Sequence, residues 1–257
     1  MSLSRPERFP LLKLPFLCIE CVIKSWDIFD IKTDHSLESC TYGMNEGTAS
    51  KMVLDFLNDV FKCSVEKVRM GGKLPESGDI GVKSTVNLHI HDANGCAQLK
   101  LLLENLEVID TCTFHVNDTN NGFYCDPKLF KCKALVFSLG SAAWVTREIL
   151  MQFEVPRLTF LRCPFSVKDI LSFVTHWFHS DSKKLEYLSI NIQNTQISLE
   201  DFQTEQLNLV PFSGRHRVPP TFGDIDLSEG LEIVRHDGLV ATIHFQGRAF
   251  LFYVCHN

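Results

Sequence analysis

The chain has 257 residues, of which 45% are hydrophobic and 22% are charged. This composition supplies enough apolar side chains to bury a core, so it excludes a wholly disordered chain. The formal net charge is -6, and acidic and basic residues are mixed along the sequence. Because the sequence has no basic stripe that would follow a phosphate backbone, we expect no nucleic-acid partner.

The N-terminal apolar run is too interrupted for a targeting or membrane segment. Residues 11–23 are broken by Lys13, Pro15 and Glu20, whereas a signal peptide or a membrane span needs a longer uncharged stretch. We therefore expect an intracellular protein, cytoplasmic or nuclear, that does not associate with a membrane. The ten cysteines lack the dense spacing of a secreted disulfide scaffold, which indicates reduced thiols.

Residues 16–27 carry apolar side chains at helical spacing. The pattern predicts one amphipathic helix, and Pro15 suits its first turn. Such a short helix is marginal alone, so its apolar stripe must pack against the rest of the chain or against a partner. The polar, turn-rich residues 32–49 predict a linker, which is followed by a second helix at 50–61.

Beyond a Gly-rich loop expected at residues 71–81, short strand-like runs alternate with helical or loop segments. We expect five such strands, at residues 86–91, 111–117, 134–139, 157–163 and 185–192. Possible equivalent anchors in these strands are Leu88, Phe114, Phe137, Leu161 and Leu188. Their spacing of 23 to 27 residues falls within the length of leucine-rich-repeat units, although the asparagine position of regular units is inconsistent.

The rest of the sequence contains one clear helix and three further strands. Residues 167–178 have an apolar stripe and begin after Ser166, a favourable helix cap. Strand-like runs at 231–235, 239–246 and 248–254 are joined by short turns and predict an antiparallel meander. The expected fold is thus α+β or α/β: a short helical N-terminal segment, then an irregular leucine-rich-repeat-like strand-helix array closed by a C-terminal antiparallel β-meander.

Two histidine pairs are the main candidates for metal chemistry. His89 and His91 share one face of a strand, and His176 and His179 are neighbours on a helix. Neither pair has a third ligand at motif spacing, and strand alternation explains His89 and His91 as members of a solvated face. No nucleophile motif is present, so we expect no enzyme, no metal and no cofactor.

Several sequence blocks resemble a known family. Residues 9–15 (FPLLKLP), the helix that follows to Trp26, and residues 27–31 resemble the first half of a nematode F-box. Residues 52–61, 167–177, 184–188 and 235–243 are similar to the type-2 F-box-associated domain. After Ile31 the sequence departs from the family, which continues with a Ser-rich and basic helix, so the F-box is expected to be truncated.

The resemblance implies three parts and an adaptor role. They are a partial F-box-like helical segment at 7–31, a linker at 32–49 and an F-box-associated recognition domain at 50–257, with strand-helix repeats at about 86–203 and the meander at about 231–255. The implied function is substrate recognition for an SCF-type ubiquitin ligase, in which the N-terminal segment binds the Skp adaptor and the domain binds an unidentified target protein. The residues implied to contact the Skp adaptor are Leu11, Leu14, Pro15, Ile19, Val22, Ile23, Trp26 and Phe29. The alternative, favoured by the missing half of the motif, is a protein-binding module with a degenerate F-box and no ligase coupling.

Overall fold

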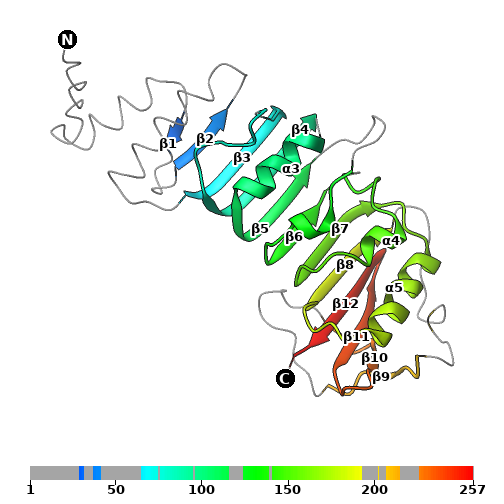
Figure 1. Ribbon diagram of the computed structural model, residues 1–257. Coiled ribbons are helices and arrows are strands. Elements are labelled where there is room, and N and C mark those ends of the chain that lie inside the picture. The colour runs from blue at the N-terminus through cyan, green and yellow to red at the C-terminus, as the bar shows by residue number, and fades with distance from the viewer. Residues whose placement is uncertain are drawn as a thin grey trace, which may run out of the picture.

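The computed structural model describes residues 29–31, 37–41, 65–74, 76–94, 96–115, 124–138, 141–192, 202, 207–214 and 226–256. Within these residues the chain forms one 12-stranded sheet, in the order β1-β2-β3-β4-β5-β6-β7-β8-β12-β11-β10-β9 (Figure 1). The helices expected at residues 16–27 and 50–61 lie outside the described residues, as does most of the expected linker.

The first part of the sheet follows the chain order. Its strands are β1 (Phe29–Ile31), β2 (Leu37–Thr41), β3 (Val65–Lys73), β4 (Ser84–Asn94), β5 (Glu107–His115), β6 (Ala134–Phe137), β7 (Arg157–Cys163) and β8 (Tyr187–Ile192). β1 is antiparallel to β2, and every neighbouring pair from β2 to β8 is parallel. Parallel neighbours need crossover connections, and these contain α3 (Cys96–Asn105), η2 (Pro127–Leu129), α4 (Arg147–Leu150) and α5 (Val167–His179).

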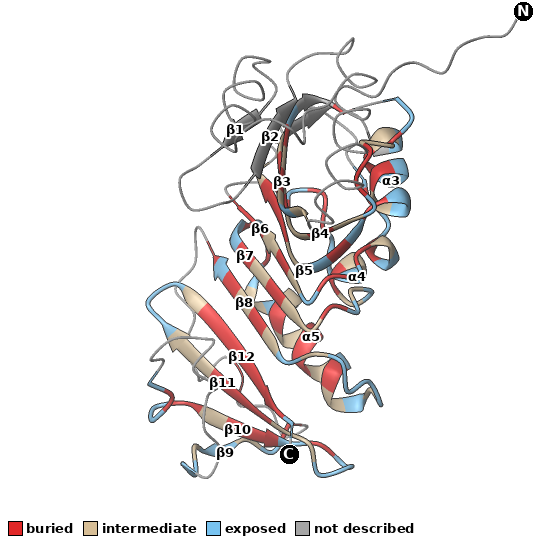
Figure 2. Ribbon diagram, turned by 90° about the vertical axis from the view of Figure 1, so that its left-hand side faces the viewer, coloured by how far each residue is buried: buried red, intermediate tan, exposed pale blue. Residues whose placement is uncertain are grey.

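The remaining strands extend the same sheet in antiparallel fashion. They are β9 (Val210–Pro211), β10 (Leu231–Val234), β11 (Val240–Gln246) and β12 (Ala249–Cys255). The last strand, β12, returns to pair with β8, and β11, β10 and β9 follow outward. Figures 1 and 2 show α3, α4 and α5 on the same side of the sheet.

The core lies between the sheet and these helices. Side chains alternate along a strand, so parallel pairing aligns buried residues of successive strands in rows that run across the sheet. One row contains Ile90, Phe114, Phe137, Phe160, Ile190 and Phe250. All of these are at most 1% exposed, and the rings of Phe137 and Phe160 stack with centroids 5.1 Å apart. α5 packs on the core beside this row, where Phe173 and Trp177 contact Phe252 of β12. The buried residues of α5 are Ile170, Phe173, Val174 and Trp177.

The fold class expected from the sequence is wrong. The described residues form one large mixed sheet with three α-helices, and no helical module followed by a repeat-like strand-helix array is present among them. The connections do not form a regular helical layer, since α4 has only 4 residues and the connection before β6 contains the 3-residue 3-10 helix η2. The three C-terminal strands do pair antiparallel, but β12 joins β8 directly, so they continue the sheet rather than close a separate array.

Two local expectations also need correction. Leu161 is 44% exposed, and its neighbour Phe160 takes the buried place in the row, because side chains alternate along β7 from buried Leu158 onward. The expected Gly-rich loop begins inside β3, which runs to Lys73.

No helix in the described part of the chain is both long and apolar enough to cross a membrane.

Candidate functional site

Polar and basic side chains occupy the sheet face opposite the helices, near β3, β4 and β5. His89 and His91 alternate with buried Leu88 and Ile90, so they point away from the core. The parallel register sets His115 of β5 directly beside His91. We call His89, His91 and His115 the histidine cluster.

The three imidazoles of the histidine cluster lie close together. The rings of His91 and His115 are stacked, with centroids 4.5 Å apart and planes inclined by 3°. The rings of His89 and His115 have centroids 6.3 Å apart at 8°. Each residue offers one ring nitrogen, and these nitrogens all lie within 4.8 Å of one another. Each of the three residues is partly buried.

The hydroxyl of Ser138 contacts the imidazole ring of His115. Ser138, which is 3% exposed, donates its hydroxyl proton to the carbonyl oxygen of Phe114 at 2.7 Å. The same hydroxyl oxygen lies 2.5 Å from Nδ1 of His115. With the single hydroxyl proton assigned to the Phe114 carbonyl, His115 Nδ1 is the donor to Ser138 and Nε2 keeps its lone pair.

The surroundings favour uncharged imidazoles. Burial lowers the pKa of His89 to about 4, and the positive charges of Lys67 and Arg69 on β3 lower it further in the same direction. Burial, followed by the neighbouring His91, also lowers the pKa of His115. At neutral pH, His89 and His115 therefore present lone pairs rather than positive charges.

Sequence reasoning missed the third histidine. His89 and His91 were recognised as a pair, but His115 is 24 residues beyond His91. The anchors Leu88 and Phe114 suggested a step of 26 residues, which is two residues off the true register of β4 and β5, where Leu88 pairs with Cys112. A spacing of 24 residues between equivalent positions of the two strands sets His91 beside His115. The correct repeat length would therefore have identified the third histidine.

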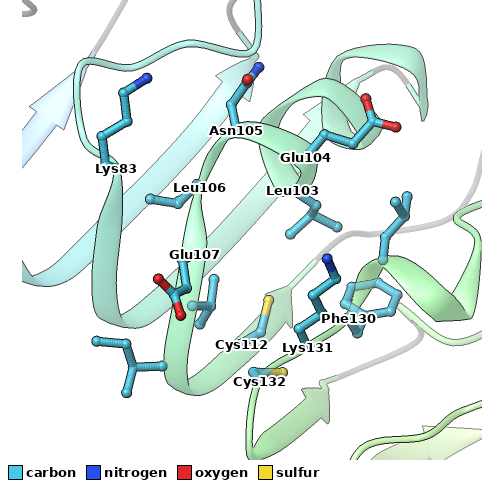
Figure 3. A pocket seen from close by; sticks show the side chains of 13 residues that line it. Lys83, Leu103, Glu104, Asn105, Leu106, Glu107, Cys112, Phe130, Lys131 and Cys132 are labelled. Atoms are coloured by element: carbon cyan, nitrogen blue, oxygen red, sulfur yellow. The ribbon is translucent and has the colours of Figure 1, made fainter.

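A pocket of about 400 Å³ lies where α3 ends and β5 begins (Figure 3). Its lining residues are Lys83, Leu103, Glu104, Asn105, Leu106, Glu107, Val108, Ile109, Cys112, Leu129, Phe130, Lys131 and Cys132. Burial raises the pKa of the Cys112 thiol well above its usual value and that of Cys132 to about 11. Both thiols are therefore protonated at neutral pH, which makes them poor nucleophiles, and this pocket is suited to binding rather than to thiolate chemistry.

The second predicted histidine pair lies on the other side of the sheet. His176 and His179 of α5 line an open hollow of about 490 Å³ together with Met151, Leu171, Ser172 and Thr175. Among the described residues, the histidine cluster is the only group of three or more His, Cys, Asp or Glu side chains close enough to hold a metal ion. The pair on α5 thus lacks a third ligand there.

The residues implied to bind the Skp adaptor are mostly beyond the described structure. Outside it lie Leu11, Leu14, Pro15, Ile19, Val22, Ile23 and Trp26. Phe29 is the first residue of β1, and its backbone position pairs with Ser39 of β2. The part of the chain expected to be an F-box-like helical segment therefore ends in a strand.

The comparisons with known proteins identify one region of the chain. A family model described as F-box associated matches residues 128–190. The match extends from η2 through β6, α4, β7 and α5 into β8, which is the central parallel part of the sheet with its helical cover. No curated protein and no solved structure matches the chain. The central part of the sheet thus matches the F-box associated family, while the histidine cluster lies ahead of the matched residues.

Proposed function

We propose that this chain is a substrate-recognition adaptor of an SCF-type ubiquitin ligase and has no catalytic activity of its own. The observation that carries the proposal is the match of residues 128–190 to the F-box associated family. The F-box-like sequence at residues 7–31 precedes that domain in the chain, in the order an adaptor requires. The N-terminal segment would bind the Skp adaptor, and the sheet domain would bind the target protein.

The proposed mechanism is proximity. An adaptor that holds a target beside a ligase raises the target's effective concentration near the transferring enzyme. Such a protein needs two binding surfaces and no reacting groups. The protonated thiols of the α3–β5 pocket are consistent with this requirement.

A second candidate function is a protein-binding module without ligase coupling. The observation that favours it is β1, which spans Phe29–Ile31 and pairs with β2. An F-box binds by burying one face of a small helical module, so a strand at this point interrupts the helical continuation and removes part of the contact. In this case the N-terminal segment would be a remnant of the motif.

Co-purification with the Skp adaptor separates the two functions. The full chain would be co-expressed with the adaptor and isolated by affinity and gel filtration, beside Leu14→Ala and Trp26→Ala. If the chain is a ligase adaptor, the unmutated chain forms a 1:1 complex whose binding energy is concentrated in a few buried side chains, and Trp26 and Leu14 are the candidates tested. Both variants should then lose the complex.

The matched control is Leu161→Ala. Leu161 is 44% exposed on β7, far along the chain from the docking segment, so its truncation should leave the complex intact. Absence of a complex with the unmutated chain would contradict ligase coupling and support the second candidate.

A further inference from the structure

We propose that His89, His91 and His115 form a binding site for one divalent transition-metal ion, with Zn²⁺ as the representative ion. This site lies outside the residues that match the F-box associated family, so it is independent of the proposed function. It brings together two residues of β4 and one of β5 that the parallel register makes neighbours.

The backbone already places the three ligands within reach of one ion. Nitrogens bound to a common zinc at about 2.0–2.1 Å stand roughly 3.4 Å apart in tetrahedral geometry. The candidate nitrogens lie within 4.8 Å of one another. The remaining difference is of the size that rotation of partly exposed imidazoles can close, while the strands that hold them stay paired.

The chemistry of the ligand set selects the class of metal. The cluster offers three imidazoles and contains no carboxylate. Imidazole nitrogens suit zinc, copper and nickel, whereas calcium and magnesium need oxygen ligands. Three protein ligands also leave a fourth position for water or for a side chain of a bound protein.

Some neighbouring groups favour metal binding at the histidine cluster, and others oppose it. The hydroxyl of Ser138 lies 2.5 Å from His115 Nδ1, a contact that orients the ring and leaves Nε2 for the metal, as in sites where a second layer of residues fixes a ligating histidine. Lys67 and Arg69, whose positive charges act on His89, oppose the binding of a cation. We therefore expect micromolar rather than nanomolar affinity.

The test is a zinc titration of the full chain, purified without a histidine tag and freed of metal by chelation. Isothermal titration with Zn²⁺ should give one site per chain, and elemental analysis after equilibrium dialysis against Zn²⁺, corrected for the metal in the dialysis buffer, should give the same ratio. His91→Gln and His89→Gln should each weaken binding at least tenfold. Ser138→Ala should weaken it roughly tenfold, the lower end of effects seen for residues that orient a ligand.

The matched control is His176→Gln, which removes an exposed histidine from the opposite side of the sheet and should leave the affinity unchanged. A second readout is the visible spectrum of the Co²⁺-loaded chain, which should show the intense bands of a tetrahedral site and lose them in His89→Gln. The proposal is overturned if the unmutated chain binds no zinc when the free Zn²⁺ concentration is about 100 times a micromolar Kd. It is equally overturned if both cluster variants bind as tightly as the control.

Discussion

Arg235 is the most deeply buried charged residue in the described structure, with a side chain that is 0% exposed. Its guanidinium donates to both carboxylate oxygens of Asp237, at 2.9 and 2.7 Å, and to the carbonyl oxygen of Ser182 at 2.8 Å. It also lies 5.2 Å from the ring centre of Trp177. These contacts tie the turn between β10 and β11 to the end of α5.

The conformation of the turn between β10 and β11 places Arg235 and Asp237 close together. Gly238 has a φ of +85°, a left-handed conformation that suits glycine, and its N–H donates to the carbonyl oxygen of Arg235. The hydrogen bonds from Arg235 hold the pKa of Asp237 well below its usual range. The ion pair of buried Arg235 with partly exposed Asp237 thus gives this turn a structural role.

Removing the guanidinium should destabilise the protein. We expect Arg235→Leu to lower the free energy of unfolding by about 3 kcal/mol, because Ser182 loses a charged donor and the Trp177 ring loses its cation. Urea unfolding followed by circular dichroism measures the change. The control is Arg162→Leu on β7, where an exposed side chain should change stability by less than about 0.5 kcal/mol. Equal effects of the two substitutions would refute this role for Arg235.

Among the elements, α5 shows what the sequence predicts well. Its apolar stripe and its cap place a helix at residues 167–178, and the structure has Val167–His179. Ser166 and Asp169 form a capping box: the Ser166 Oγ accepts from the backbone N–H of Asp169, and Asp169 accepts from the backbone N–H of Ser166. The signal is strong because helix start, periodicity and burial agree within one short segment.

Removal of the cap should cost a measurable part of the stability. Ser166→Ala leaves the N–H of Asp169 without its partner, and we expect a loss of about 1 kcal/mol in the free energy of unfolding. The control on the same helix is Ser172→Ala, whose hydroxyl bonds back to the carbonyl oxygen of Lys168. Such a bond does not support a helix end, and alanine has the better helix propensity, so this variant should be unchanged or slightly more stable.

Other elements were predictable in position but not in register. β7, expected at 157–163, has the bounds Arg157–Cys163, yet Leu161 was chosen as its buried anchor in place of Phe160. A strand's face is set by alternation, so an error of one residue turns every side chain to the other side. A different error, a shift of two residues between β4 and β5, kept the correct face but hid His115 from the histidine cluster. β3 (Val65–Lys73) is absent from the predicted strands, and its last residues were expected to be a loop because of their glycines, whereas pairing with β4 makes them a strand.

At the scale of the whole molecule, long-range pairing decided what local patterns could not. The strand-like runs at the C-terminus predicted hairpins, but nothing local indicates that β12 returns to β8 across the segment between them. That pairing joins the parallel and antiparallel parts into one sheet. It also extends one hydrophobic core from β3 to β10, with Val68 at one end and Ile233 at the other.

A continuous core predicts a single unfolding transition, and two tryptophans can test it. Trp144 packs on Phe137 with ring centroids 6.0 Å apart, and Trp177 packs on Phe252 at 5.0 Å. They therefore report on the parallel and the antiparallel parts of the sheet. The chain has three tryptophans, so Trp26→Phe combined with Trp177→Phe or with Trp144→Phe leaves one reporter in each protein.

In each of these proteins, tryptophan fluorescence and far-ultraviolet circular dichroism should give the same urea midpoint. Coincident probes are the signature of two-state unfolding, and here they would follow from the rows of buried side chains that cross from β8 to β12. Comparing two probes within one protein removes the effect of the substitutions on the midpoint itself. If the Trp177 signal changed at lower urea than the dichroism, the antiparallel strands would be an independent unit, and the pairing of β8 with β12 would contribute little to holding the sheet together.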